Sequence, residues 1–526
     1  MDFKEPSVHA SQRSRSVTNR SINQKAQQTI DSVASRVSTD PEKDVLNRTM
    51  YPMIISQLIQ EIVMLFIFYT VWHYTNNAVM QQFAIVYPIC NFISVQIPRA
   101  ISQAQLGRLN RFIVEAKIKM ADEAMTVHFV CQAIYFGVSL IACYLLTVTF
   151  TYQAGITEND KNYVAVYIVL TCSAGTLLNI FNNSTEALLI LEAKNFYNFI
   201  RSTASSVSYL AITLVSYQYV TAQKMALSLT PLAISQLISQ IIPAIIVMLN
   251  YQDFTALPSQ GILRAKVKYI KSISGQAIKE VFAHTVPRVL QFGSIYLLNF
   301  SAQLVVTQTY LVDSDIKIAR LGLFIYILSY NLFSCVSTSF QVTSEQILSL
   351  NLQQKKYIRS KGFLLKGLVW GVFWQVVSLI IALVAGTSII EFFIPDSQAL
   401  DKEYYLLYGM KYITYSYSMP ILQIFFNFSM TVTAIEDDIK IGMLQSVIPL
   451  IVGVVTLLVT QFMIGDRAEL FWIQYYADLF SGISGAILLV RKIFEVMQLA
   501  KIELRRLKRK KRLEEEGVTE KIEGKD

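Results

Sequence analysis

YPMIISQLIQEIVMLFIFYTVWHY, residues 51–74, and MQQFAIVYPICNFISVQIPRAISQAQLGRLN, residues 80–110, are separated by a short polar break. Each of the two stretches is long enough to cross a bilayer as a helix, because about 20 residues span the hydrocarbon core. Two spans joined by so short a break must run antiparallel. The rest of the chain continues this pattern, so we expect a series of membrane-crossing helices.

The composition of the whole chain fits a membrane protein. Of its 526 residues 53% are hydrophobic and 16% are charged, and the mean hydropathy is +0.41, whereas soluble domains carry about 25% charged residues. Only helices and closed barrels satisfy their own backbone hydrogen bonds in lipid. The apolar runs are too long and continuous for barrel strands. We therefore predict an all-α polytopic membrane protein, embedded in the lipid bilayer.

Several classes of protein are disfavoured by what the sequence lacks. The five cysteines fall inside apolar runs without a partner at metal or redox spacing, so we interpret them as small buried residues. No Walker A, HExxH or GxSxG motif occurs, which speaks against an ATP-driven pump or a membrane hydrolase. The basic residues behind the net charge of +9 cluster beside the spans. We expect no enzymatic activity, no cofactor and no nucleic-acid partner.

The pattern of apolar and polar stretches divides the chain into five parts. Residues 1–47 are polar and lack the apolar core of a signal peptide, so we expect a disordered cytoplasmic tail. Residues 48–250 and 280–497 each hold six apolar runs, which predicts two pseudo-symmetric six-helix bundles. A basic cytoplasmic linker at 251–279 joins them, and a charged tail follows at 498–526.

The charges beside the spans give an orientation. We predict twelve spans, starting near residues 50, 80, 122, 163, 197, 224, 281, 318, 363, 404, 440 and 468. Lysines and arginines follow the even-numbered spans, among them Lys194 and Arg201 after span four, while the alternate loops are poor in both. This positive-inside pattern predicts that both termini are cytoplasmic. We expect a monomer, and the plasma membrane is our default location.

The two halves of the sequence resemble each other. Ile180–Glu192 and Ile424–Glu436 share Ile, Phe, Asn and Glu at equal spacing. Arg99–Asn110 aligns with Gln341–Leu352, each at the end of the second span of its half. An even number of spans per half makes the repeats parallel, as in many secondary transporters, whose site lies between the halves or inside one of them.

With these features the chain resembles the MATE family of multidrug and toxin extrusion antiporters, within the wider MOP flippase superfamily. The resemblance rests on the Pro52-x-x-x-x-Gln57-x-x-Gln60 opening of span one, the SQAQLGRLN end of span two and the six-plus-six layout, over roughly residues 48–497. It implies two six-helix bundles around a V-shaped cleft. It also implies alternating access driven by an H⁺ or Na⁺ gradient, with export of organic cations and other xenobiotics.

One departure from the family concerns the residues that couple transport to the ion. Family members often carry an Asp in span one where this chain has Ile67, and many carry an acid in span seven, where residues 285–312 have none. Glu61 lies mid-span, with Gln57 one helical turn before it on the same face. Ile67 is about 120° further round the helix, so Glu61 does not simply replace the missing Asp.

Span four carries the clearest polar stripe. Asn179, Asn182, Asn183 and Glu186 have the i, i+3, i+4, i+7 spacing of one helix face. Ionisable groups inside spans are costly and are functional candidates by default. Amide and carboxylate oxygens suit a hard cation, so Na⁺ could bind at Asn179, Asn182 and Glu186, or the carboxylate could exchange protons.

Arg99 in span two leaves three interpretations open. It could neutralise Glu61 or Glu186 in a fixed, buried ion pair, or it could stand beside a coupling site at one of these carboxylates. It could also bind an anionic substrate.

Weaker candidates lie in the second half. Asn427 is the span-ten equivalent of Asn183, and Asp478 in span twelve could help to bind a cation, although hydrogen bonding between helices explains it as well. Tyr415 could line a cleft for cationic substrates, or it is an interfacial aromatic residue. Arg288 lies near a span end, and we expect its charge to reach the interface.

Three functions remain for the whole chain. The first is a secondary active antiporter that exports small cationic or amphipathic organic molecules, coupled to H⁺ or Na⁺. The second is a flippase of the same superfamily that moves a lipid or lipid-linked oligosaccharide. The third is a transport-inactive relative that serves as a scaffold, which the missing Asp leaves open.

Overall fold

The computed structural model describes residues 40–114, 117–153, 158–191, 195–225, 228–251, 267–309, 313–394, 419–436, 438–461 and 472–515. Every regular element in these ranges is a helix. The first half holds α2 (Glu42–Tyr74), α3 (Asn77–Asn91), η1 (Phe92–Gln96), α4 (Ile97–Val114), α5 (Ile118–Gln153), α6 (Glu158–Leu170), η2 (Thr171–Gly175), α7 (Thr176–Leu191), α8 (Asn195–Ala222) and α9 (Thr230–Tyr251). The second half holds η3 (Val267–Ser272), α10 (Gly275–Thr309), α11 (Asp313–Gln353), α12 (Tyr357–Phe392), α14 (Met419–Ile435), α15 (Ile439–Val459) and α16 (Trp472–Glu515).

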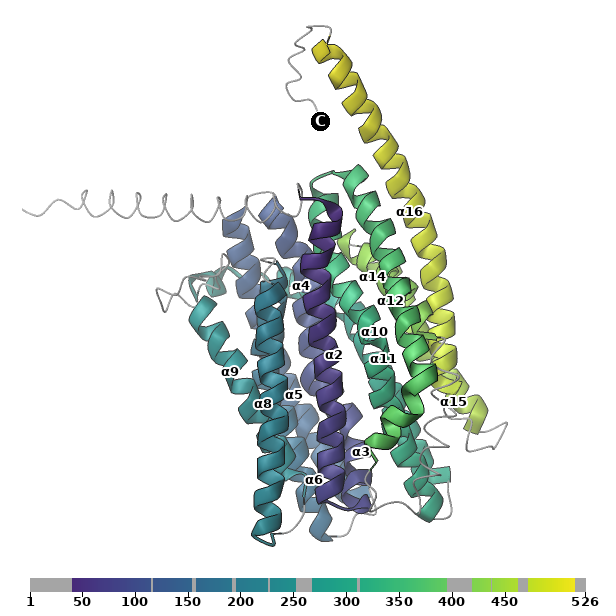
Figure 1. The fold of residues 1–526 in the computed structure, drawn as a ribbon. Coiled ribbons are helices and arrows are strands. Elements are labelled where there is room, and N and C mark those ends of the chain that lie inside the picture. The colour runs from purple at the N-terminus through teal and green to yellow at the C-terminus, as the bar shows by residue number, and fades with distance from the viewer. Residues whose placement is uncertain are drawn as a thin grey trace, which may run out of the picture.

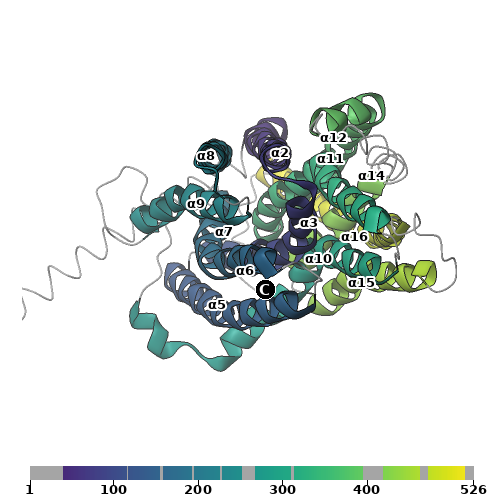
Figure 2. The ribbon, with the colours of Figure 1, turned by 90° about the horizontal axis from the view of Figure 1, so that it is seen from below.

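These helices confirm the predicted all-α polytopic membrane fold. Eight helical stretches in the described ranges are long and apolar enough to cross a bilayer. Each predicted span coincides with a described helix, although the tenth, predicted from residue 404, is described only from Met419. Figure 2 looks along the helices and shows most of the first half (purple to teal) on one side and most of the second half (green to yellow) on the other.

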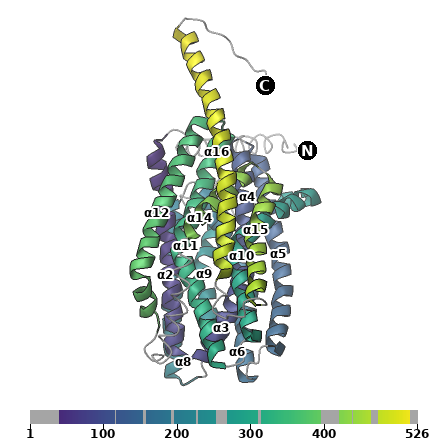
Figure 3. The same cartoon turned by 90° about the vertical axis from the view of Figure 1, so that its right-hand side faces the viewer.

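Three boundaries differ from those expected from the sequence. α2 begins at Glu42, inside the segment assigned to the N-terminal tail, because Val45 and Leu46 pack against apolar residues of the second half. α10 begins at Gly275, inside the segment assigned to the linker. α16 continues to Glu515 and projects beyond the other helices (Figures 1 and 3), so the charged tail is helical over its first part.

Spans two and four are each interrupted by a π-helical segment, η1 and η2. Such segments inside α-helices often occur at functional sites. η1 is followed by Pro98, whose ring clashes with the carbonyl group four residues earlier and so disfavours a regular α-helix there. η1 and η2 pack against each other, and both contribute to the candidate site described below.

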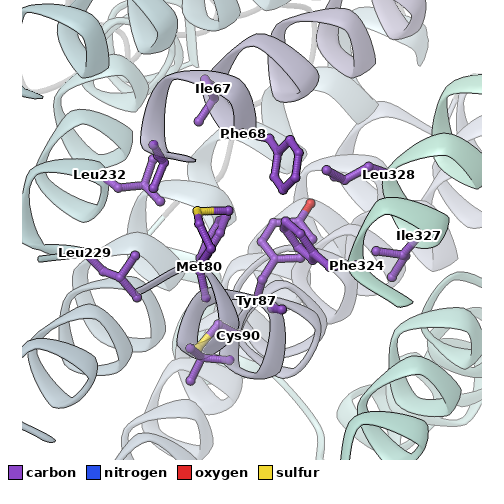
Figure 4. Packing of buried hydrophobic residues seen from close by; sticks show 14 of the residues in the cluster. Ile67, Phe68, Met80, Tyr87, Cys90, Leu229, Leu232, Phe324, Ile327 and Leu328 are labelled. Atoms are coloured by element: carbon purple, nitrogen blue, oxygen red, sulfur yellow. The ribbon is translucent and has the colours of Figure 1, made fainter. Parts of the chain in front are cut away.

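We call the end of the bundles at which α2 begins and α16 projects the tail end, and the opposite end the far end (Figure 1). At the far end the two halves are joined by aromatic packing. The ring of Phe324 in α11 lies 5.3 Å from Phe68, 5.2 Å from Phe83 and 5.4 Å from Tyr87, measured between centroids. Figure 4 shows this cluster, with Ile67 beside it.

At the tail end the two halves instead border a cavity of about 660 Å³. It is lined by α4 and α5 of the first half and by α10, α11, α14 and α15 of the second. One ion pair of its lining that crosses between the halves runs from Arg108 Nη2 to Glu280 Oε2 at 3.4 Å. The far end is thus filled with side chains, while the tail end is hollow.

Candidate functional site

The first half of the chain contains a polar cavity of about 260 Å³. It is lined by every primary candidate of the sequence analysis: Gln57 and Glu61 from α2, Arg99 from α4, and Asn179, Asn182, Asn183 and Glu186 from α7. We call it the N-cavity. The sequence predicts which of these residues share a face of α2 or of α7. The structure adds that α2, α4 and α7 line the same cavity.

A second cavity of about 110 Å³ lies between the two halves, and we call it the central cavity. It shares part of its wall with the N-cavity, and the shared residues come from both halves: Gln57, Glu61, Gln96, Arg99, Tyr296 and Asn331. On the other side it reaches Asn427 of α14 and Gln474 of α16. Glu61 and Arg99 therefore lie where the two spaces meet.

Glu61 has no direct partner in the described part of the chain. No hydrogen bond or ion pair joins its carboxylate to any residue within the described ranges, although it lines both cavities. The charge of Arg99 acts on it through space, but no nitrogen of Arg99 lies within the 4.0 Å of an ion pair. An unpaired charge is costly inside a membrane protein, so this carboxylate is suited to receive a proton or a cation.

Arg99 does not form the fixed ion pair that was one of its three interpretations. Its guanidinium carbon lies 5.2 Å from the centre of the Phe292 ring in α10. Its Nε and Nη2 atoms are buried and have no hydrogen-bond acceptor among the residues that the structure describes. An arginine normally uses these two donors to bind a carboxylate or phosphate in a bidentate manner.

Glu186 is paired with an arginine that the sequence analysis missed. Arg201 Nη2 lies 3.5 Å from Glu186 Oε2, and the two side chains are 7% and 11% exposed. Asn198, one turn before Arg201 on α8, accepts from its Nε at 3.1 Å and from its Nη2 at 2.8 Å. We had assigned Arg201 to the positive-inside charges. That was wrong, because α8 lies against α2 and α7 and buries its first turns.

The ion pair between Arg201 and Glu186 affects the Na⁺ site expected at Asn179, Asn182 and Glu186. Two oxygens there, Asn182 Oδ1 and Glu186 Oε1, are buried without a protein donor. The charge of Arg201, however, already neutralises the same carboxylate. A second cation at this position would be repelled by the guanidinium, so this donor set does not fit Na⁺.

Several tyrosines line the same cavity as Glu61, a feature that the sequence analysis did not single out. The N-cavity is lined by Tyr87, Tyr167, Tyr209 and Tyr296. The charge of Glu61 acts on both Tyr87 and Tyr296. Aromatic faces attract organic cations, so the cavity combines a carboxylate with the surfaces that such a cation prefers.

The position at which family members often carry the span-one Asp cannot bind a cation or a proton in this chain. Ile67 is fully buried in the apolar cluster with Phe68, Met80 and Leu232 (Figure 4). It does not line either cavity. This agrees with the expected rotation between Ile67 and Glu61, which places the two side chains on different faces of α2.

The second half contains a buried network in which a charged pair is linked to amide and hydroxyl side chains. Arg288 Nη2 contacts Glu345 Oε1 at 2.6 Å, and both side chains are 2% exposed. Arg288 also donates to Gln291 at 3.0 Å, Gln291 donates to Asn427 at 3.0 Å, and Asn427 donates to Ser337 at 2.8 Å. The expectation that Arg288 reaches the interface was wrong, because α11 supplies a carboxylate inside the bundle.

Asp478 is held in the same manner. Its carboxylate is fully buried and accepts three hydrogen bonds, from Tyr330 at 2.6 Å, Gln423 at 2.5 Å and Gln474 at 2.7 Å. These donors come from α11, α14 and α16. The arrangement favours hydrogen bonding between helices over cation binding. Tyr415, the remaining candidate, lies outside the described residues.

Comparison with known proteins places this geometry in a known fold. No protein-family model matches the chain, and no curated protein sequence matches it. Among solved structures, "Outward-facing conformation of a multidrug resistance MATE family transporter of the MOP superfamily" matches with a TM-score of 0.69 at 11% identity, covering 88% of this chain and 98% of the other.

Two further solved structures match to a similar degree. "Crystal structure of MATE in complex with MaL6" has a TM-score of 0.67 at 12% identity, covering 89% of this chain and 99% of the other. "Reverse polarity of binding pocket suggests different function of a MOP superfamily transporter from Pyrococcus furiosus" has a TM-score of 0.67 at 11% identity, with 88% and 98% covered. This chain therefore has the fold of the MATE transporters of the MOP superfamily, as the sequence resemblance predicted.

Proposed function

We propose that this protein is a secondary active transporter, a MATE-like antiporter that exports organic cations in exchange for protons, with Glu61 as the exchanging group. The observation that carries the proposal is the position of Glu61. Its carboxylate lies on the wall shared by the N-cavity and the central cavity, and none of the described residues pairs with it. The other carboxylate of the N-cavity, Glu186, is already paired with Arg201.

Exchange follows from competition for one carboxylate. A proton and an organic cation each neutralise Glu61, and binding of one disfavours binding of the other. The tyrosine faces around Glu61 supply affinity for the cation, which a proton does not need. Coupling through H⁺ rather than Na⁺ also accords with the poor fit of the span-four stripe to a metal cation.

Alternating access is supported by the difference between the two ends. The aromatic cluster closes the far end, whereas the cavity of about 660 Å³ opens the tail end. If both termini are cytoplasmic, as the positive-inside pattern predicts, this arrangement faces the cytoplasm. Transport then requires the aromatic contacts between the halves to separate while the tail end closes. We retain the plasma membrane as the proposed location.

The test uses the purified full chain in liposomes with an imposed pH gradient and a fluorescent organic cation, ethidium. We expect gradient-driven efflux in the wild type and its loss in Glu61→Gln. Glu495→Gln, at an exposed position on α16, makes the same change of charge and should transport normally. Efflux that persists in Glu61→Gln, or that follows a Na⁺ gradient alone, would contradict the proposal.

A flippase is the second candidate, and Arg99 favours it. Its two buried donors without a protein acceptor could bind the phosphate of a lipid headgroup. The distinguishing measurement is movement of a fluorescent anionic phospholipid between the leaflets of the same liposomes. Lipid movement that is lost in Arg99→Gln, without efflux of ethidium, would establish the flippase instead.

A further inference from the structure

The wall shared by the N-cavity and the central cavity carries one charge of each sign. Glu61 projects from α2 and Arg99 from α4, and both side chains line both cavities. They influence each other electrostatically without making an ion pair. We propose that the preferred substrate is an organic cation that also carries a negative group, a zwitterion, with its positive group at Glu61 and its negative group at Arg99, and that a simple cation such as ethidium binds more weakly. This inference rests on the proposed transport function and specifies its substrate class.

The other buried charges near the cavities are neutralised by partners. Of the charged side chains that line the N-cavity, Glu186 and Arg201 form a pair, and only Glu61 and Arg99 remain. Glu61 and Arg99 are also the charged side chains that line the central cavity. The unpaired charges are therefore opposite in sign and belong to one site.

The chemistry around each charge differs in the way that a zwitterion requires. Tyr87 and Tyr296 line the same cavity as Glu61, and aromatic faces beside a carboxylate suit an alkylated ammonium group. At Arg99, Nε and Nη2 offer two parallel donors, which suit a carboxylate or phosphate. The remaining shared wall consists of the amides of Gln57, Gln96 and Asn331 and the hydroxyl of Tyr296.

A ligand with a single charge would satisfy only half of this site. A cation at Glu61 would leave the buried donors of Arg99 unpaired, and an anion at Arg99 would leave the carboxylate unpaired. Leaving a buried charged group without a partner costs free energy even when the rest of the ligand fits. The site therefore discriminates against analogues that lack either charge.

Three small probes of similar shape test the inference. Glycine betaine carries a trimethylammonium group and a carboxylate, choline carries the same cation without the anion, and 3,3-dimethylbutanoate carries the carboxylate with a neutral tert-butyl group. Binding is measured by the ligand-dependent rise of the thermal unfolding midpoint of the purified full chain. We expect the wild type to bind betaine about tenfold or more tightly than either analogue.

Two substitutions should remove the preference for betaine, one in favour of the cation and the other in favour of the anion. Arg99→Gln should bind choline at least as tightly as betaine, and Glu61→Gln should bind 3,3-dimethylbutanoate at least as tightly as betaine. Arg491→Gln and Glu495→Gln change the same charges at exposed positions and should keep the wild-type order. The unfolding midpoints without ligand show whether each variant is folded, and Arg99→Lys, which keeps the charge, should retain part of the preference.

Equal affinity for choline and betaine in the wild type, or no stabilisation by any probe, would overturn the inference. If ethidium efflux is driven by the pH gradient while the probes show no preference for the zwitterion, the substrate class is wrong and the proposed function stands. If the probes follow the predicted order while no gradient drives efflux, the binding site stands and the antiport mechanism fails.

Discussion

The two halves of the molecule differ in one respect: Glu345 and Asp478 of the second half have direct partners, whereas Glu61 of the first half has none among the described residues. In the second half, Glu345 contacts Arg288 at 2.6 Å and Asp478 accepts three hydrogen bonds. In the first half, Glu61 has no direct partner among the described residues and borders two cavities. All three carboxylates would be functional candidates on the basis of burial alone. What distinguishes Glu61 is that none of the described residues forms a hydrogen bond or an ion pair with its carboxylate.

This difference distinguishes carboxylates that stabilise the fold from one that is available to a ligand. A paired carboxylate fixes the packing of its helices, because removing one partner leaves the other partner buried and unpaired. An unsatisfied carboxylate adds little to stability and remains available to a ligand. The predictions below use substitutions in both halves, and they are ordered from the largest expected effect on the free energy of unfolding to the smallest.

The largest effect is expected at the Arg288–Glu345 pair. Glu345→Gln should lower the free energy of unfolding by about 3–5 kcal/mol, because it leaves the Arg288 charge buried without a counter-ion. Denaturant titration in detergent measures the change. Replacing both residues with Met should recover most of the loss. A loss below about 1 kcal/mol for the single variant would show that the pair does not organise the second half.

An intermediate effect is expected at Asp478. Tyr330→Phe removes the hydroxyl that donates to Asp478 at 2.6 Å and leaves that carboxylate oxygen without its donor. The free energy of unfolding should fall by about 1–3 kcal/mol. The matched control is Tyr144→Phe on the exposed face of α5, which should have no measurable effect. Equal stability of the two variants would mean that Asp478 is not held by this bond.

A smaller effect is expected at the exposed ion pair between Lys366 of α12 and Glu42 of α2. The two charges lie 2.5 Å apart, but the lysine side chain is 56% exposed. Lys366→Gln should cost less than about 1 kcal/mol, and the loss should disappear at high salt. Salt at about 1 M screens exposed charges. A loss of stability that persists at this salt concentration would show that water does not reach the pair.

The smallest effect on stability is expected at Glu61. Glu61→Gln removes a charge that has no direct partner, so the free energy of unfolding should stay within about 0.5 kcal/mol of the wild type or rise. The same denaturant titration compares it with Glu345→Gln, which makes the identical chemical change in the other half. A loss as large as that of Glu345→Gln would place Glu61 among the structural carboxylates.

Much of the fold and part of the site follow from local sequence patterns. The spans are readable because each apolar run is as long as a bilayer is thick. The stripe from Asn179 to Glu186 is readable because helical periodicity sets it. All seven primary candidates do line one cavity. The predicted start of α2 was late because Val45 and Leu46 are buried by helices that are distant in the sequence.

The partners of the charges could not be predicted in the same way. Arg201 and Arg288 looked like interfacial residues, since a sequence shows where a charge lies along a helix but not which helix packs against it. Both are buried because a carboxylate from another helix meets them. The tyrosines that line the cavity with Glu61 come from α3, α6, α8 and α10, and only the assembled bundles bring them together.

The central claim is that substrate and proton compete for Glu61, and proton release on binding tests it most directly. Purified wild-type protein in weakly buffered detergent is titrated with ethidium while a pH-sensitive dye reports the free proton concentration. We expect protons to be released on cation binding near neutral pH, up to one per bound cation. Release should vanish in Glu61→Gln and persist in Glu495→Gln. Undiminished release in Glu61→Gln would contradict the account.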